Sequence, residues 1–324
     1  MLSSEQPLSA LDSYYLGSMQ AGRINIINTA AGSGVKLAGS LRGSDNISVK
    51  AYDIRAESQI SNASTQHDSN ENYQNYRGGI YINDRSTNQK LTRTELAGKN
   101  ISLLADNNNH LTATDIRGDE IKLQGASLTL DGQQLKQTQG QTNDRWFYSS
   151  QYDVTRENEQ LQQIGSTITA TKNATLTARV QDVKLLGATV AAGDALKIEA
   201  RRDVQIAGLV ERDKTSERGY QRNHTSSLRT GNWSNGNETE SLKASDLHAG
   251  GELDLTAGNN LVTQGAKVHT KGNLTVTPKN GSTSTYKRPS IRKRLATIQP
   301  HGAGSAAAII KTTATAARSA TPPN

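Results

Sequence analysis

The sequence predicts an all-β protein, a right-handed parallel β-helix with coils of about 20 residues. Two observations carry this prediction. Pairs of apolar residues two positions apart recur at a nearly constant interval, and Gly, Asn and Asp stand between the pairs. Bulky core residues are also scarce, because the 324-residue chain is 33% hydrophobic and holds one Phe and two Trp. A solenoid tolerates this composition, since each thin coil fills its narrow interior with small aliphatic side chains.

The repeat is clearest in GGELDLTAGNNLVTQGAKVHTKGNLTVTP, residues 250–278. A spacing of two points to strands, in which alternate side chains share a face. The intervals are 21 residues from Leu253 to Leu274, and 20 residues both from Ile101 to Ile121 and from Leu176 to Leu196. Units this short cannot bury their own apolar face, so they must stack. A leucine-rich repeat would need apolar residues three apart and a helical return arm, and the sequence offers neither.

The chain divides into an irregular N-terminal segment (1–15), a β-helical shaft (16–277) and a basic low-complexity tail (278–324). Polar excursions interrupt the shaft at about 61–95, 137–163 and 211–244. Leu103, Leu176 and Leu255 occupy equivalent places, 73 and 79 residues apart, so about two coils alternate with one excursion. The stretches YRGGIYIND (76–84) and DRWFYSSQYDV (144–154) have strand-like halves. We therefore expect hairpins that protrude from one face of the shaft.

The net charge of +7 is concentrated in the tail. Residues 279–324 carry eight Lys and Arg and no acid, so the first 278 residues are close to neutral, at −1. The tail has no apolar alternation and is expected to be disordered. Its cluster KRPSIRKRL (287–295) could contact phosphates. Since only Tyr286 stands near it as a stacking aromatic, we expect a solvated tail and no nucleic-acid partner.

Several classes of protein are excluded or disfavoured. The chain has no Cys, hence neither a disulfide framework nor thiolate chemistry. No stretch approaches the roughly 20 apolar residues of a membrane helix, so no membrane span is expected. The opening MLSSEQPLSALDSYYLGSMQ lacks the basic and apolar regions of a secretory signal. Without an export signal, this chain alone would stay in the cytoplasm.

The sequence shows no catalytic, cofactor or metal motif. Its six histidines are scattered, and we expect no metal and no cofactor. Asp182, Asp203 and Asp254 recur at turn-like positions, where a β-helical carbohydrate-active enzyme would need a carboxylate pair. Their spacing is better explained by corner residues, so we expect no enzyme. Asn-x-Ser/Thr sites are numerous in a chain this rich in Asn, Ser and Thr, and the sequence does not say whether any is glycosylated.

The excursions hold most of the aromatic residues and are the candidate partner-binding surface. Tyr and Trp combine contact area with a polar group, which suits sugars or protein partners. The alternative is that these rings pin the hairpins in place. The candidate binding residues are Tyr76, Tyr81, Trp146, Tyr148, Tyr152, Tyr220 and Trp233.

The N-terminal stretch YLGSMQAGRINIINTAAGSGVKLAGSL (15–41) resembles a segment of filamentous haemagglutinin-type exoproteins. The pattern is Met-x-Ala-Gly-x-Ile followed by Thr-x-x-Gly-x-Gly-Val and a later Ala-Gly. The excursion ERDKTSERGYQRNH (211–224) is similar to those of the haemagglutinin repeat region in the same proteins. The resemblance covers about residues 15–277.

The resemblance implies a rod-shaped secreted or surface adhesin of Gram-negative bacteria, exported by two-partner secretion. The partners would be a host or neighbouring-cell glycan or protein and, for the full-length parent, an outer-membrane transporter. We expect a non-enzymatic shaft fragment that mediates cell adhesion. The stalk of a contact-dependent growth inhibition toxin protein is the alternative, and the carbohydrate-active enzyme is the third. An Asn-Pro-Asn secretion motif, a Val-Glu-Asn-Asn boundary and a toxin-like domain are absent from the sequence, so the match is to internal shaft.

Overall fold

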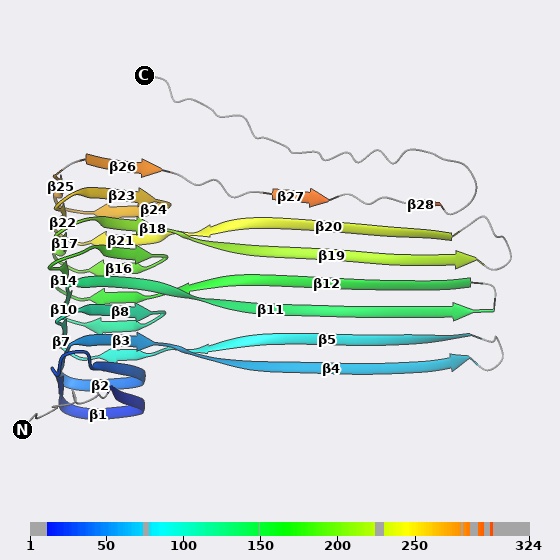
Figure 1. The fold of residues 1–324 in the computed structure, drawn as a ribbon, viewed down its shortest axis with the longest axis horizontal. Helices are drawn as coiled ribbons and strands as arrows, with labels where there is room; N and C mark the ends of the chain where they lie inside the picture. The colour runs from blue at the N-terminus through cyan, green and yellow to red at the C-terminus, as the bar shows by residue number, and fades with distance from the viewer. Residues whose placement is uncertain are drawn as a thin grey trace, which may run out of the picture.

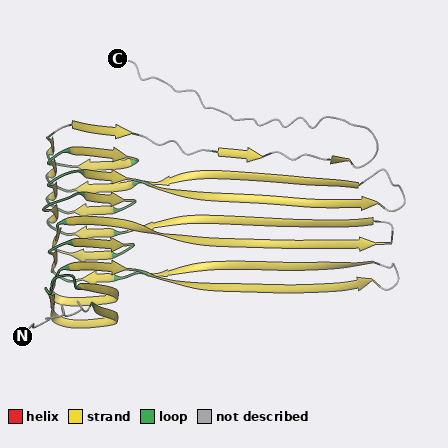
Figure 2. Cartoon of the chain, in the orientation of Figure 1, coloured by secondary structure: helices red, strands yellow, loops and turns green. Residues whose placement is uncertain are grey.

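The computed structural model describes residues 12–73, 78–148, 150–223, 230–279, 281–285, 291–294 and 299–300. Within these ranges every regular element is a strand (Figures 1 and 2). Parallel strands stack into a β-helix solenoid, which confirms the predicted fold class. A flat sheet of long antiparallel strands projects from one side of this shaft (Figure 1).

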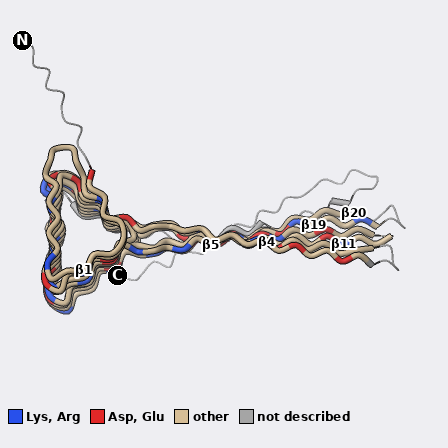
Figure 3. Tube along the Cα trace, turned by 90° about the horizontal axis from the view of Figure 1, so that it is seen from below, with Lys and Arg blue, Asp and Glu red and all other residues tan. Residues whose placement is uncertain are grey.

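The shaft is triangular in cross-section (Figure 3). β1 (Ser13–Asn28) and β2 (Gly34–Ala51) each wrap around all three sides. Later coils have one strand per side. Side 1 continues through β3 (Asp53–Glu57), β8 (Asn108–Thr112), the start of β11 (Ser127–Phe147), β15 (Val183–Leu186), β18 (Val204–Ala207), β23 (Asn260–Gln264) and β26 (Gly281–Thr285).

The other two sides are built in the same way. Side 2 holds β6 (Glu95–Ala97), β9 (Asp115–Gly118), β13 (Thr167–Ala170), β16 (Thr189–Ala192), β21 (Ser245–Ala249) and β24 (Ala266–Thr270). Side 3 holds β7 (Asn100–Ala105), β10 (Glu120–Gly125), β14 (Ala174–Ala178), β17 (Leu196–Ala200), β22 (Leu253–Ala257) and β25 (Leu274–Pro278).

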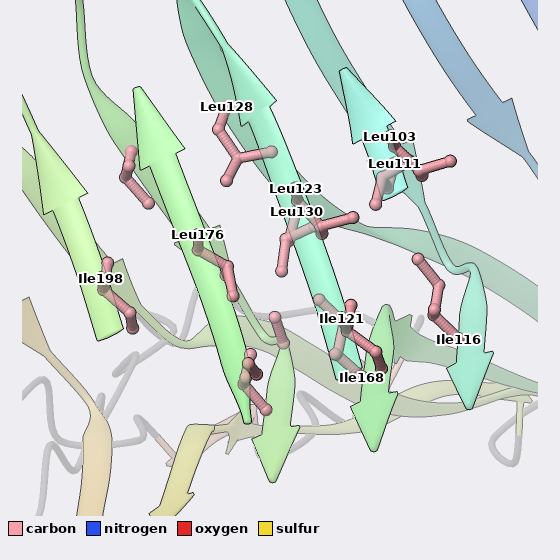
Figure 4. Packing of buried hydrophobic residues seen from close by; sticks show 14 of the residues in the cluster. Leu103, Leu111, Ile116, Ile121, Leu123, Leu128, Leu130, Ile168, Leu176 and Ile198 are labelled. Atoms are coloured by element: carbon pink, nitrogen blue, oxygen red, sulfur yellow. The ribbon is translucent and has the colours of Figure 1, made fainter. Parts of the chain in front are cut away.

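Inward side chains of successive coils form aliphatic ladders. On side 3 one ladder runs through Val49, Leu103, Leu123, Leu176, Ile198 and Leu255, all buried. Figure 4 labels its four middle members, from Leu103 to Ile198. Each buried Leu or Ile stabilises the shaft by roughly 1.5–3 kcal/mol relative to exposure. The predicted equivalence of Leu176 and Leu196 was wrong, because Leu196 lies beside Ala174 and Leu176 beside Ile198. A slip of two residues keeps both side chains inward, so the apolar pattern does not reveal it.

Hairpins leave the shaft at the corner between side 1 and side 2, in every second coil. They comprise β4 (Gln59–Tyr73) with β5 (Gly78–Thr92), the outer part of β11 with β12 (Ser150–Gly165), and β19 (Leu209–Asn223) with β20 (Thr230–Lys243). In the intervening coils the same corner closes in a short turn. Gly187 and Gly265 make that turn with φ of 60° and 65°, which a residue without Cβ adopts at little cost.

The hairpins pair with one another as well as internally. β5 pairs with β11, and β12 pairs with β19, both antiparallel. Two neighbouring strands occupy about 9.6 Å, and two stacked coils occupy the same distance. Hairpins that emerge from every second coil are therefore spaced to meet edge to edge. We call this continuous layer the hairpin sheet, made of β4, β5, residues 132–147 of β11, β12, β19 and β20.

The structure differs from the predicted boundaries at several places. Strand β1 begins at Ser13, inside the segment expected to be irregular. The second excursion leaves the shaft near Gly132, five residues before the predicted start at 137. The shaft does not stop at Thr277, because β26 pairs with β23 in a further coil. Beyond it, β27 (Ile291–Arg294) and β28 (Gln299–Pro300) run along β20, while residues 301–324 of the predicted disordered tail lie outside the described residues.

Candidate functional site

A buried hydroxyl stands where each hairpin returns to the shaft. The three residues are Thr94, Ser166 and Ser245, each at most 1% exposed. A hairpin interrupts the path from side 1 to side 2 and leaves backbone groups at the corner to be satisfied. Each hydroxyl donates to the carbonyl that ends the side 1 strand and accepts from a backbone N–H of the preceding coils.

The third of these residues shows the geometry in full. Ser245 Oγ lies 2.6 Å from the carbonyl oxygen of Ala207 and 3.1 Å from that of Leu185, and it accepts from the Ala188 N–H at 3.2 Å. The serine thus ties two adjacent coils together at the base of the hairpin. Sequence reasoning missed this set, although the recurring pattern Ser/Thr-x-Leu/Ile at 94–96, 166–168 and 245–247 could have indicated it.

The hairpin sheet is a single layer whose side chains are mostly polar and at least partly exposed. Ion pairs connect neighbouring strands of this sheet: Arg156 with Glu217 at 2.8 Å, Lys136 with Glu159 at 2.8 Å, and Arg212 with Glu238 at 3.1 Å. Exposed pairs contribute little individually. The continuous antiparallel ladders therefore provide most of the order, and the shaft fixes the spacing of the hairpins.

Each tryptophan covers the glycine that faces it on the neighbouring strand. Trp146 lies opposite Gly79 and Trp233 opposite Gly219, and a Cβ on either glycine would overlap the indole ring. Aromatic side chains placed over cross-strand glycines stabilise sheets in this way. The ring of Trp233 also lies 5.5 Å from that of Tyr152, and its Nε1 donates to Glu217 at 3.0 Å.

The register divides the predicted binding residues between the two faces of the sheet. Directly opposed residues share a face, and successive residues alternate. Tyr81, Trp146 and Tyr220 fall on one face, and Tyr152 and Trp233 on the other. Tyr148 lies in the turn after β11, and Tyr76 lies outside the described residues. The candidate residues therefore do not form one continuous surface.

Exposed aromatics gather at the outer end of the second hairpin. Trp146, Phe147, Tyr148 and Tyr152 are 38%, 42%, 75% and 39% exposed. Phe147 was not among the predicted residues, although it lies within the aromatic run that the sequence displays. The rings lie at or next to the end of β11 and the start of β12, at the end of this hairpin that is far from the shaft (Figure 1).

One face also carries a facing pair of carboxylates. Asp144 and Asp153 lie directly opposite each other, between Tyr81 and Tyr220. Partial burial, and then the charge of Asp153, raise the pKa of Asp144. Further down the same face, hydrogen bonds led by that from Asn83 lower the pKa of Asp68, which also accepts from the Tyr81 hydroxyl at 3.2 Å. Like charges directly opposed weaken a sheet locally.

The aspartates considered for catalysis are engaged in the shaft. Asp182 accepts from the backbone N–H of Asp203 at 3.2 Å, and Asp203 accepts from that of Asn260 at 3.0 Å, so both cap the next coil at the corner before side 1. Asp254 was wrongly grouped with them, since it lies within β22 and accepts from Thr256. In the described part of the chain no group of three or more His, Asp or Glu side chains is placed to hold a metal.

Comparison with known proteins supports the repeat. Residues 147–280 match the family model described as Hemagglutinin repeat. This part of the chain is therefore similar to haemagglutinin repeats. Two proteins, each named Hemolysin, resemble it over most of its length: that of Serratia marcescens is 69% identical over 277 residues, and that of Proteus mirabilis is 54% identical over 280 residues.

These alignments cover 86% of the chain but only 17% and 18% of the two relatives. The chain thus spans less than a fifth of the length of these relatives. No solved structure matches it. A helix long and apolar enough to cross a membrane is not found in the described ranges.

Proposed function

We propose that the chain is a non-enzymatic shaft segment of a secreted or surface exoprotein, and that its hairpin sheet contacts a host or neighbouring cell in adhesion. The observation that carries this proposal is the placement of exposed aromatic rings at the outer end of the sheet. A shaft that holds such rings away from its axis is suited to contact through the outer end of the hairpin sheet. The haemagglutinin repeat and the two hemolysin relatives support an exoprotein, whose full-length form would use an outer-membrane two-partner transporter.

The partner class that fits these rings is a glycan or a protein. Aromatic faces stack on sugar rings, and the hydroxyl of Tyr148 and nearby amides supply hydrogen bonds. Phe147 and Tyr148 are the best probes, because they are the most exposed of these rings, at 42% and 75%, whereas removal of Trp146 would uncover Gly79 and disturb the sheet. We expect Phe147→Ser combined with Tyr148→Ser to weaken binding of the labelled chain to cells about tenfold or more, as loss of central aromatic contacts does.

The matched control is Val180→Ser, which removes an exposed apolar side chain from the shaft. It should leave cell binding unchanged. Hydrogen exchange of β11 and β12 would show that the tip variant keeps its hairpin. Treating the cells with glycosidases or with protease before the assay separates a glycan from a protein partner.

The alternative is a stalk that presents a toxin domain and binds nothing itself. In that case neither the tip variant nor the Val180 variant would differ from the unchanged chain in the amount retained on cells. That outcome would remove the adhesive function and leave the shaft as a spacer.

A further inference from the structure

Strand β4 forms an open edge of the hairpin sheet. It runs from Gln59 to Tyr73, and in the described residues it pairs with β5 alone. An edge strand presents a row of backbone N–H and C=O groups that can pair with another strand. The register with β5 is continuous from end to end, so no bulge twists this edge away.

The opposite edge of the sheet is partly covered. β27 pairs antiparallel with β20 from Thr239↔Ile291 to Gly236↔Arg294, and β28 pairs with it at Asn232↔Gln299 and Gly231↔Pro300. The chain has no described strand in the equivalent place beside β4. The two coils before β3 pass the same corner directly, at Gly17 and Gly39, and insert no hairpin there.

The usual protections of an edge strand are missing from β4. Its sequence, QISNASTQHDSNENY, contains no Lys, no Arg and no Pro, the residues that most often block strand addition. Most of its side chains are polar and exposed. A partner strand can therefore approach residues 59–66 without meeting a charged side chain.

The charges on β4 select the direction of that partner. Both acids, Asp68 and Glu71, lie in the outer half of the strand, and residues 59–66 carry no charge. A second β4 in parallel register would set Asp68 against Asp68. An antiparallel copy centred on Gln66 sets Asp68 opposite Ser64 and Glu71 opposite Ser61, so like charges are separated.

We propose that β4 pairs antiparallel with β4 of a second copy of this chain, joining two hairpin sheets edge to edge in a two-fold dimer. The interface is isologous, so it closes after two copies and does not propagate into a fibre. It extends the antiparallel pattern already present from β4 to β20. The shafts lie at opposite ends of the joined sheet. This association does not depend on the adhesive function proposed above.

The test is analytical ultracentrifugation of the full chain over a range of concentrations, with two opposite charge variants. Ser61→Glu with Ser64→Glu faces the acids of the second copy and should raise the dimer Kd about fivefold or more at low salt. Ser61→Lys with Ser64→Lys should lower it by a similar factor. Both shifts should shrink at high salt. The same substitutions at Ser234, an exposed residue of β20, serve as controls and should change nothing.

Cross-linking gives the register independently, because the chain has no native cysteine. Single cysteines at positions 64 to 68 should form an inter-copy disulfide most readily at one position, which marks the two-fold axis. Hydrogen exchange should show β4 amides protected only at high concentration, with β5–β11 protection unchanged. The proposal would be overturned if the chain stayed monomeric at every concentration, or if the Glu and Lys variants shifted the dimer Kd in the same direction. Association that leaves β4 unprotected would also overturn it.

Discussion

The match between hairpin spacing and coil spacing makes a prediction about the hairpin sheet. Duplicating residues 183–203 directly after Asp203 adds one complete coil, because Val183 and Val204 are register partners on adjacent coils. The second and third hairpins would then emerge from coils three apart instead of two. The inserted coil continues every ladder of the shaft, so the shaft should fold as before.

The size of the effect follows from the strand spacing. One extra coil moves β19 about 4.8 Å further from β12, which places N–H and C=O groups well beyond hydrogen-bond distance. The ladder lost runs from Ser150↔Asn223 to Leu161↔Arg212. It holds about one hydrogen bond per residue pair, each contributing about 0.5–1.5 kcal/mol net. The hairpins themselves keep their internal pairing.

Hydrogen exchange with mass spectrometry measures the result strand by strand. We expect faster exchange at those amides of β12 and β19 that bond between the hairpins, and unchanged exchange within β11–β12 and β19–β20. The matched control inserts the same residues between Asn260 and Leu261, where the register is equivalent but the spacing of these two hairpins is untouched. Full protection of the β12–β19 ladder in the first insertion would refute the argument that coil spacing controls hairpin pairing.

Three further changes test the hairpin sheet and its attachment. Gly219→Ala should push the Trp233 ring off the sheet and increase its quenching by acrylamide, whereas Gly231→Ala, which meets no atom within 4 Å, should not. Ser245→Ala should destabilise the base of the third hairpin by about 1–3 kcal/mol in urea unfolding, because buried backbone partners lose their hydroxyl, and Ser241→Ala on the exposed strand should be near neutral. Asp144→Asn should slow exchange in β11 and β12 at neutral pH. Burial, and then the charge of Asp153, raise the pKa of Asp144, so its ionisation costs stability fully above the raised pKa, and the cost is lost as the pH falls to the ordinary carboxyl range. The gain should therefore disappear in acid, and an equal gain at both pH values would contradict the argument.

The sequence by itself determined the fold class of the shaft. Apolar residues two apart, recurring at about 20 residues with Gly, Asn and Asp between them, allow only stacked short strands, because no single unit can bury its apolar face. The matched places of Leu103, Leu176 and Leu255 also placed the hairpins in the correct order. These are local and periodic properties, and the sequence carries them directly.

Only the tertiary structure decided how the parts meet. The pairing of β12 with β19 joins segments that share no sequence pattern. It depends on two neighbouring strands of the hairpin sheet occupying the same distance as two stacked coils of the shaft. The division of Tyr152 and Trp146 between opposite faces depends on register, which a slip of one residue would reverse. Ser245 shows the same limit, since its hydroxyl has a role only because a hairpin leaves backbone groups of two adjacent coils unsatisfied around it.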